Sequence, residues 1–200
     1  MLGVAMSSPP DLSASILSAW RTTNRVTTYL IEQIPPGLWT ATVPGVPRRT
    51  IRMIAGHLHN SRCSWIRTLG GEYGVTVPAR VDHRAVSRRA LLAALRPSSR
   101  GIESLLRLAL AADGVLPPPK AYVWRNLPLD VGHILTYFAA HEAHHRGQIM
   151  MALRQLGQPM PRTVMGGLWQ WTQRAREAPG TATGKPGRRD HGGLRKEGGP

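Results

Sequence analysis

Three histidines and a glutamate form the one segment of this 200-residue sequence in which side chains capable of chemistry crowd together at a meaningful spacing. The segment reads His141-Glu142-Ala143-His144-His145. Residues four apart on an α-helix lie one turn above each other on the same face, so His141 and His145 can share one divalent metal ion. The string also satisfies H-E-x-x-H, the helix signature of zinc metalloproteases, in which Glu142 would be the general base.

The protease interpretation needs a third ligand downstream, and the sequence does not supply it. The extended form of the motif places glycine at position 148 and histidine at position 151, where this chain has Gln148 and Met151. The next acid, Glu177, lies close to the presumed tail. No strand pattern indicates the sheet on which such a helix usually rests. The five-letter motif is therefore weak evidence for a protease.

A helical bundle would take its third ligand from upstream. His57 lies in a segment of helical periodicity and can face His141 and His145 across a bundle, where metal sites are built from side chains on facing helices. Three neutral imidazoles suit zinc, nickel or iron(II) and leave coordination positions open for water or a substrate. His59 competes with His57, but two residues of helix rotate it roughly 200° away. Gln148 and Glu142 can reach the ligands as hydrogen-bonding partners.

Four long segments with apolar residues at helical spacing predict an all-α fold, a four-helix bundle. Pro97 inside the third segment predicts a kink or two abutting helices. A short extra helical segment is expected over residues 161–175, and residues 120–129 are ambiguous. The four helices are expected from Asp11 or Ser13 to about Gln33, from Ile51 (capped by Thr50) to about Leu69, from Asp82 to about Ala112, and from Asp130 to about Leu156.

Helical projection of the fourth segment places His141 and His145 on its buried face and turns Arg146 away from it. Phe138 and Gln148 share that face, so both can line a pocket. The remaining histidines are expected at the surface or beside the ligands: His59, His83, His133, His144 and His191. The tryptophans are expected in the core or at an interface: Trp20, Trp65, Trp124, Trp169 and Trp171.

The net charge of +15 is large, and most of it lies outside the C-terminal segment. Residues 179–200 hold five basic side chains against two acidic ones, which leaves +12 for the body. Such a charge can attract nucleic acid or anionic substrates. The arginines are scattered and are not interleaved with aromatic residues as a base-stacking surface requires. A solvated surface is therefore favoured over nucleic-acid binding, which stays the alternative.

The chain length and composition predict one domain with two tails. Residues 1–10 are expected to be a flexible N-terminus, residues 11–178 the bundle, and residues 179–200 a disordered basic tail. No apolar run of about 18 residues predicts a membrane span. The first ten residues lack the features of a signal peptide, so a cytoplasmic location is expected. Cys63 is the only cysteine, which excludes an internal disulfide.

Three stretches of the sequence resemble the DinB/YfiT-like metalloenzyme family (the DinB superfamily). The segment 140–149 is similar to the family's fourth-helix motif. The segment 54–62, which contains His57 and is followed by Trp65-Ile66, is similar to the second-helix motif. Segments 153–157 and 167–171 extend the likeness, which covers roughly residues 11–175. One histidine on the second helix paired with H-x-x-x-H on the fourth makes the resemblance quite specific.

The resemblance implies an up-down-down-up four-helix bundle, often a homodimer, with a metal site formed here by His57, His141 and His145. Family members include thiol-dependent S-transferases and a mycothiol-dependent isomerase, in which the metal activates a low-molecular-weight thiol. The resemblance therefore implies a small-molecule substrate and a transferase or hydrolase reaction. Pro97 and the basic tail depart from the family pattern.

The predicted mechanism is metal activation of a thiol or water, because a divalent cation lowers the pKa of the group it binds. Glu142 is the candidate proton acceptor and Gln148 the candidate pocket residue. The alternative is a non-catalytic, metal-stabilised stress-response protein that uses its basic surface to bind anions or nucleic acid.

Overall fold

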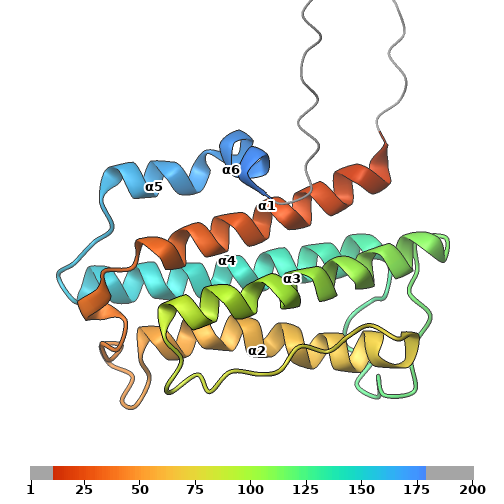
Figure 1. Ribbon diagram of the computed structural model, residues 1–200, viewed down its shortest axis with the longest axis horizontal. Coiled ribbons are helices and arrows are strands. Elements are labelled where there is room, and N and C mark those ends of the chain that lie inside the picture. The colour runs from red at the N-terminus through yellow and green to blue at the C-terminus, as the bar shows by residue number, and fades with distance from the viewer. Residues whose placement is uncertain (1–10, 179–200) are drawn as a thin grey trace, which may run out of the picture.

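The computed structural model describes residues 11–178, in which every regular element is a helix (Figure 1). The expected all-α fold is confirmed for these residues, while the predicted N-terminus 1–10 and tail 179–200 lie outside them. Within the described range, pairing between extended segments is limited to two isolated bridges. The four long helices are α1 (Leu12–Gln33), α2 (Ile51–Gly70), α3 (Arg88–Ala111) and α4 (Val131–Gln155); α5 (Arg162–Trp169) and α6 (Trp171–Glu177) are short, as are the 3₁₀ turns η1 (Pro36–Leu38) and η2 (Gly71–Tyr73).

Three long helices begin where the sequence predicts, because each has a capping side chain. Asp11, Thr50 and Asp130 accept a hydrogen bond from the backbone N–H three residues further on, at 3.1, 3.3 and 3.0 Å. Each bond satisfies an amide that has no partner inside its own helix. After α4, Gly157 adopts a φ of 72°, a left-handed conformation that suits the end of a helix.

The third helix differs from its prediction at its start and around Pro97. It begins at Arg88 with Ser87 as the cap, while Asp82 accepts the Arg84 N–H within a turn. Pro97 lies inside one continuous helix, so the expectation of two abutting helices is wrong. An interior proline costs about 3 kcal/mol. Burial of the apolar face of α3 opposes this cost, through Leu91, Leu95, Ile102, Leu105, Leu106 and Ala109.

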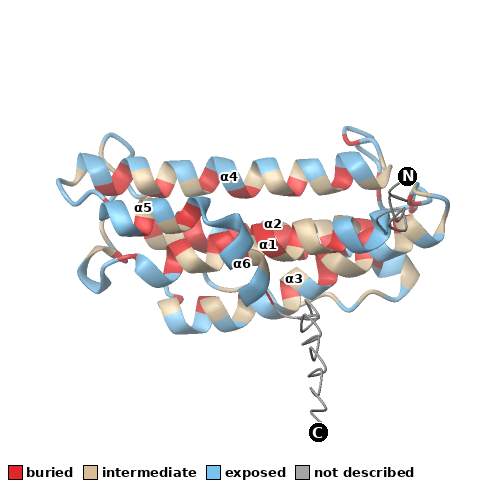
Figure 2. Cartoon of the chain, turned by 90° about the horizontal axis from the view of Figure 1, so that it is seen from above, coloured by how far each residue is buried: buried red, intermediate tan, exposed pale blue. Residues whose placement is uncertain are grey.

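The long helices pack so that α1 and α2 each contact both α3 and α4. The short helices α5 and α6 lie on α1, on the side away from α2 (Figure 1). Buried residues recur at intervals along the helices, and on α4 they lie on the side that faces the other helices (Figure 2). The edge of Phe138 meets the ring of Trp20 in this core, with centroids 5.8 Å apart. Phe138 is therefore a packing residue and does not line the pockets described below.

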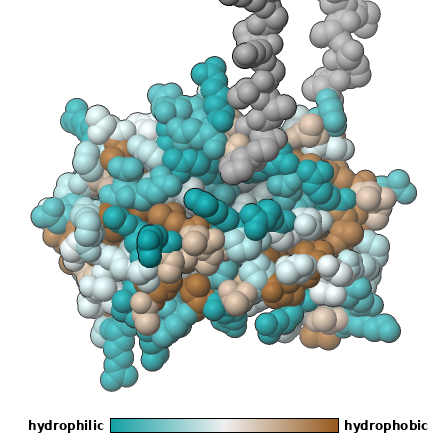
Figure 3. All heavy atoms as spheres, viewed as in Figure 1, coloured by the Kyte–Doolittle hydropathy of each residue, from teal (hydrophilic) through white to brown (hydrophobic). Residues whose placement is uncertain are grey.

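Of the tryptophans, Trp20 is fully buried and Trp65 is partly buried against aromatic neighbours. Trp124, Trp169 and Trp171 are 67%, 78% and 42% exposed, so they do not lie in the core, and their placement at an interface stays a prediction. Hydrophobic residues also reach the surface as separate patches among hydrophilic ones (Figure 3). Within residues 11–178, no helix combines the length and apolar character needed to cross a membrane.

Candidate metal centre

Three histidines converge between α2 and α4. Each of His57, His141 and His145 offers one ring nitrogen, and these three atoms all lie within 4.8 Å of one another. The ring centroids of His57 lie 5.4 Å from His141 and 4.7 Å from His145. The structure thus brings together the three residues that the sequence singles out.

The local fold explains this convergence. His141 and His145 are one turn apart on α4, and packing of α2 against α4 carries His57 to them. The buried neighbours Ile54 and Leu58 fix the rotation of α2, which leaves His57 exposed at the edge of the bundle. His145 is buried and His141 is partly buried. The cluster therefore has a buried side and a side open to solvent.

The spacing of two of the ring nitrogens fits a shared metal ion. The Nε2 atoms of His141 and His145 are 3.2 Å apart. Two nitrogens on one tetrahedral zinc ion are roughly 3.3 Å apart, since each Zn–N bond is about 2.0–2.1 Å long. The donor set of imidazole nitrogens matches the ligands that zinc, nickel and iron(II) accept.

Gln148 fixes the protonation pattern of His145. Its Oε1 accepts a 2.8 Å bond from His145 Nδ1, and its Nε2 lies 2.9 Å from His144 Nε2. The Arg49 guanidinium donates to the same Oε1 at 3.4 Å, which supports this orientation of the amide. Because Nδ1 carries the proton in neutral His145, its Nε2 presents a lone pair to the cluster.

The surroundings keep the three imidazoles neutral. Desolvation by burial lowers the pKa of His141 to about 4, and the nearby charge of protonated His145 adds to this effect. Desolvation also lowers the pKa values of His57 and His145, with further contributions from neighbouring cationic groups. A neutral imidazole is the form that binds a metal, so the cluster is prepared for a cation at neutral pH.

A cavity of about 520 Å³ opens onto the cluster and is lined by His57 and His145. Its wall contains the guanidinium groups of Arg48, Arg49 and Arg80 and no carboxylate. Gln148 is among its lining residues, and His83 and His144 complete its imidazole groups. Sequence reasoning missed the three arginines, because they come from two loops and only the fold gathers them.

Glu142 lies in the core, away from this cavity. Its side chain is fully buried and its Oε1 accepts a 2.9 Å bond from Arg62 Nε, while Arg62 Nη2 lies 2.9 Å from the same oxygen. Arg62 also donates through Nη1 to Asn24 and stacks over the ring of Trp20. One residue of helix turns a side chain by about 100°, so Glu142 faces a different side of α4 from His141.

Two further placements differ from the sequence-based expectations. His59 is buried, with Nε2 2.8 Å from the Ala79 carbonyl and Nδ1 3.1 Å from Ser98 Oγ, so a surface position is wrong. It does point away from the cluster, as its helical position predicts. Arg146 is not turned away from the bundle, because it donates to the buried Thr27 hydroxyl of α1. His133 is exposed beside its cap residue, and His191 lies outside the described residues.

An all-helical domain with three converging histidines belongs to the class of candidate metalloproteins. The DinB family model matches residues 6–178, and the chain belongs to the DinB family. A search among curated proteins found no match.

Proposed function

We propose that this protein is a metal-dependent enzyme in which His57, His141 and His145 hold a divalent zinc, nickel or iron ion. The proposed reaction is the thiol S-transferase chemistry of DinB-like enzymes, with a low-molecular-weight thiol as co-substrate. Hydrolysis by activated water is the variant of the same chemistry. Membership in the DinB family and the convergence of the three histidines support this proposal.

The observation that carries the proposal is the 3.2 Å separation of the His141 and His145 Nε2 atoms, with His57 beside them. Burial lowers the pKa values of the three rings, so each ring is neutral at neutral pH and keeps one N–H. In His145 that proton lies on Nδ1, which leaves the Nε2 lone pair available for a cation. A divalent metal ion shared by the three histidines fits this donor set.

A bound divalent ion would lower the pKa of a thiol or water and so supply a nucleophile at neutral pH. The chain's own residues prepare the cavity for that chemistry. Arg48, Arg49 and Arg80 give it a positive wall, which favours a thiolate over a thiol and attracts anionic substrates. Gln148 holds His145 in the tautomer whose Nε2 faces the cluster. The role of Glu142 as proton acceptor stays a prediction. Its hydrogen bond with Arg62 opposes that role, because the carboxylate already has a cationic partner.

The bundle topology, the oligomeric state, the kind of substrate and the cellular location belong to the same proposal. In Figure 1, α1 and α4 run in one direction and α2 and α3 in the other, which supports an up-down-down-up bundle. From the family resemblance we expect a homodimer that acts on a small molecule in the cytoplasm, with residues 11–178 as the functional domain. Light scattering of the purified protein tests the dimer, and a monomer at every concentration would exclude it.

Cobalt substitution tests the proposed site. Cobalt(II) bound by three imidazoles gives visible absorption bands, and a low-molecular-weight thiol that enters the coordination sphere adds a sulfur-to-metal band in the near ultraviolet. We expect both signals in the unmodified protein and neither in the H141A variant. The matched control is H133A, on the same helix but exposed and outside the cluster. Full metal retention by H141A would reject the site.

The second candidate function is a non-catalytic, metal-stabilised protein with an anion- or nucleic-acid-binding surface. The formal charge of +15 favours it. This function predicts salt-sensitive affinity for nucleic acid that weakens when residues 179–200 are removed, and no spectral response of the cobalt form to thiols.

A further inference from the structure

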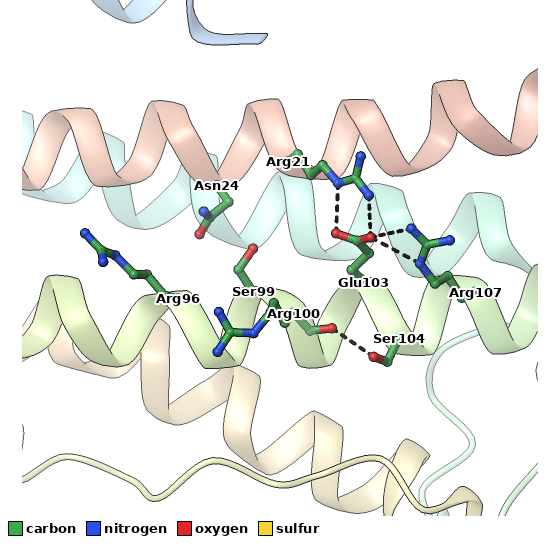
Figure 4. Close-up of a pocket in the computed structure, with 8 residues that line it drawn as sticks. All are labelled: Arg21, Asn24, Arg96, Ser99, Arg100, Glu103, Ser104 and Arg107. Carbon is green, nitrogen blue, oxygen red and sulfur yellow. Dashed lines mark hydrogen bonds and ion pairs between the residues drawn. The ribbon is translucent and has the colours of Figure 1, made fainter. Parts of the chain in front are cut away.

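A second cavity, between α1 and α3, is lined by groups that the metal proposal does not use. Its volume is about 420 Å³, within the range of small-molecule sites. It shares no lining residue with the cavity at the histidine cluster. The side chains that line it come from both helices and surround the space between them (Figure 4): Arg21, Asn24, Arg96, Ser99, Arg100, Glu103, Ser104 and Arg107.

The one carboxylate of this cavity is already neutralised by two guanidinium groups. Glu103 accepts from Arg21 Nε at 2.9 Å across the two helices, and from Arg107 Nη2 at 2.7 Å along α3 (Figure 4). The hydrogen bond from Arg21 is the main reason that the pKa of Glu103 is lowered, so the carboxylate stays ionised. Glu103 therefore cannot also satisfy the remaining arginines.

Two guanidinium groups and one hydroxyl of the cavity lack partners in the described part of the chain, whereas the Ser104 hydroxyl donates to the Arg100 carbonyl at 3.0 Å. The guanidinium groups of Arg96 and Arg100 and the Ser99 hydroxyl make no hydrogen bond or ion pair within residues 11–178. Asn24 accepts from Arg62 Nη1 at 2.9 Å, which turns its amide oxygen toward the core and leaves its NH₂ as a further donor. Most of the unused hydrogen-bonding capacity here belongs to donors, because guanidinium groups only donate, while the Ser99 hydroxyl can donate or accept.

The formal charge of the cavity also favours an anion. Four guanidinium groups against one carboxylate leave a formal charge of +3. Arg96, Arg100 and Arg107 fall within about 40° of one another around α3, taking 100° per residue. Glu103 lies in the same row and pairs with Arg107. Arg96 and Arg100 are like charges four apart, which destabilises a helix, and an anion bound against both would relieve this repulsion.

We propose that this cavity binds a small anion with two or more charges, such as a pyrophosphate or a phosphate ester. Arginine matches phosphate oxygens with two parallel hydrogen bonds, and two unpaired guanidinium groups can hold two phosphoryl groups. The Ser99 hydroxyl and the Asn24 amide supply neutral donors at the cavity wall. The Arg21–Glu103–Arg107 pairing keeps α1 and α3 at the spacing that forms the cavity.

Titration calorimetry with inorganic pyrophosphate tests the proposal. We expect saturable binding with one site and a dissociation constant on the order of 0.1 mM or tighter. The R96Q/R100Q variant removes the two unpaired guanidinium groups and is expected to weaken binding at least about tenfold. The matched control, R89Q/R154Q, removes two exposed charges that do not line the cavity and is expected to bind as the unmodified protein does.

The histidine cluster is intact in all three proteins, so pyrophosphate bound to a metal would affect them equally. Equal affinity for the two double variants, or no saturable binding, would overturn the proposal. Tighter binding of a single-stranded oligonucleotide that increases with its length and is insensitive to R96Q/R100Q would also overturn it in favour of an extended surface. Metal content, measured on the same samples, separates this result from the fate of the proposed metal site.

Discussion

The histidine cluster and the Arg62–Glu142 pair both join α2 to α4, yet they solve opposite physical problems. The pair buries two full charges that compensate each other, at 1% and 0% side-chain exposure. The cluster lies at the bundle edge and gathers three rings, each of which offers one nitrogen to a point where a metal ion could bind. The first contact is a charge pair within the chain, and the second is a set of neutral donors suited to a cation. The H-E-x-x-H string contributes to both, because consecutive helical positions face different environments.

Breaking the pair is expected to give the largest effect on stability. In R62M, Glu142 loses its partner in the core, and an unpaired buried charge costs about 3–5 kcal/mol. Urea unfolding followed by circular dichroism measures the loss. The R62M/E142L double variant removes both charges and is expected to recover most of that stability. A single variant that loses less than about 1 kcal/mol would show that the pair does not lock α2 to α4.

Removing one histidine of the cluster is expected to leave the metal-free protein stable and to abolish its stabilisation by zinc. At a zinc concentration 100-fold above its dissociation constant, binding stabilises the unmodified protein by about 2.7 kcal/mol. The H141Q variant is expected to fold without zinc and to gain nothing from it. Unfolding with and without zinc measures the stability of the metal-free protein and the stability gained from zinc. H133Q, on the same helix, serves as the control. Equal stabilisation of H141Q by zinc would place the metal elsewhere.

Substitution of Gln148 tests whether its hydrogen bond orients His145 for metal binding. Loss of the hydrogen bond to His145 Nδ1 in Q148L is expected to weaken metal binding by about 10–100-fold, since the ring then loses its fixed tautomer. Competition with a chromophoric chelator measures this affinity. Q155L, at an exposed position of the same helix, is the control. An unchanged affinity in Q148L would mean that packing alone orients His145.

The smallest expected effect is a dependence of the stability of the metal-free protein on pH. Burial lowers the pKa of His141 to about 4 in the folded protein, from the ordinary value of about 6.5 for histidine. The unfolded chain therefore binds more protons between these values, and the stability that is full above pH 6.5 falls as the pH drops toward 4. Because the ring is partly exposed, we expect a loss on the order of 1–2 kcal/mol. Urea midpoints of chelator-treated protein at several pH values should decline less steeply in H141Q.

Local chemistry in the sequence determined much of the fold. Asp11, Thr50 and Asp130 are capping residues wherever a helix follows, so three helix starts are predictable. The i, i+4 spacing of His141 and His145 also guarantees their proximity once that segment is helical. The position of His57 follows from the same reasoning only after the bundle is assumed.

Only the tertiary structure decided where the less regular features lie. The start of α3 moved from Asp82 to Arg88 because the turn at Asp82 and the Ser87 cap compete with helix for the same backbone groups. Helical periodicity predicts which residues of a helix are buried to within about one position. An error of one position decides whether Glu142 faces the cavity or the core.

The two arginine-lined cavities were beyond sequence reasoning for a related reason. Arg49 and Arg80 lie in separate loops, and Arg21 and Arg100 lie on separate helices. Scattered arginines look like a solvated surface in a sequence, since their spacing along the chain carries no information about contacts across the bundle. The sequence by itself determined the helices and the histidine pair on α4. Packing of distant segments determined the approach of His57, the partner of Glu142 and the charge of both cavities.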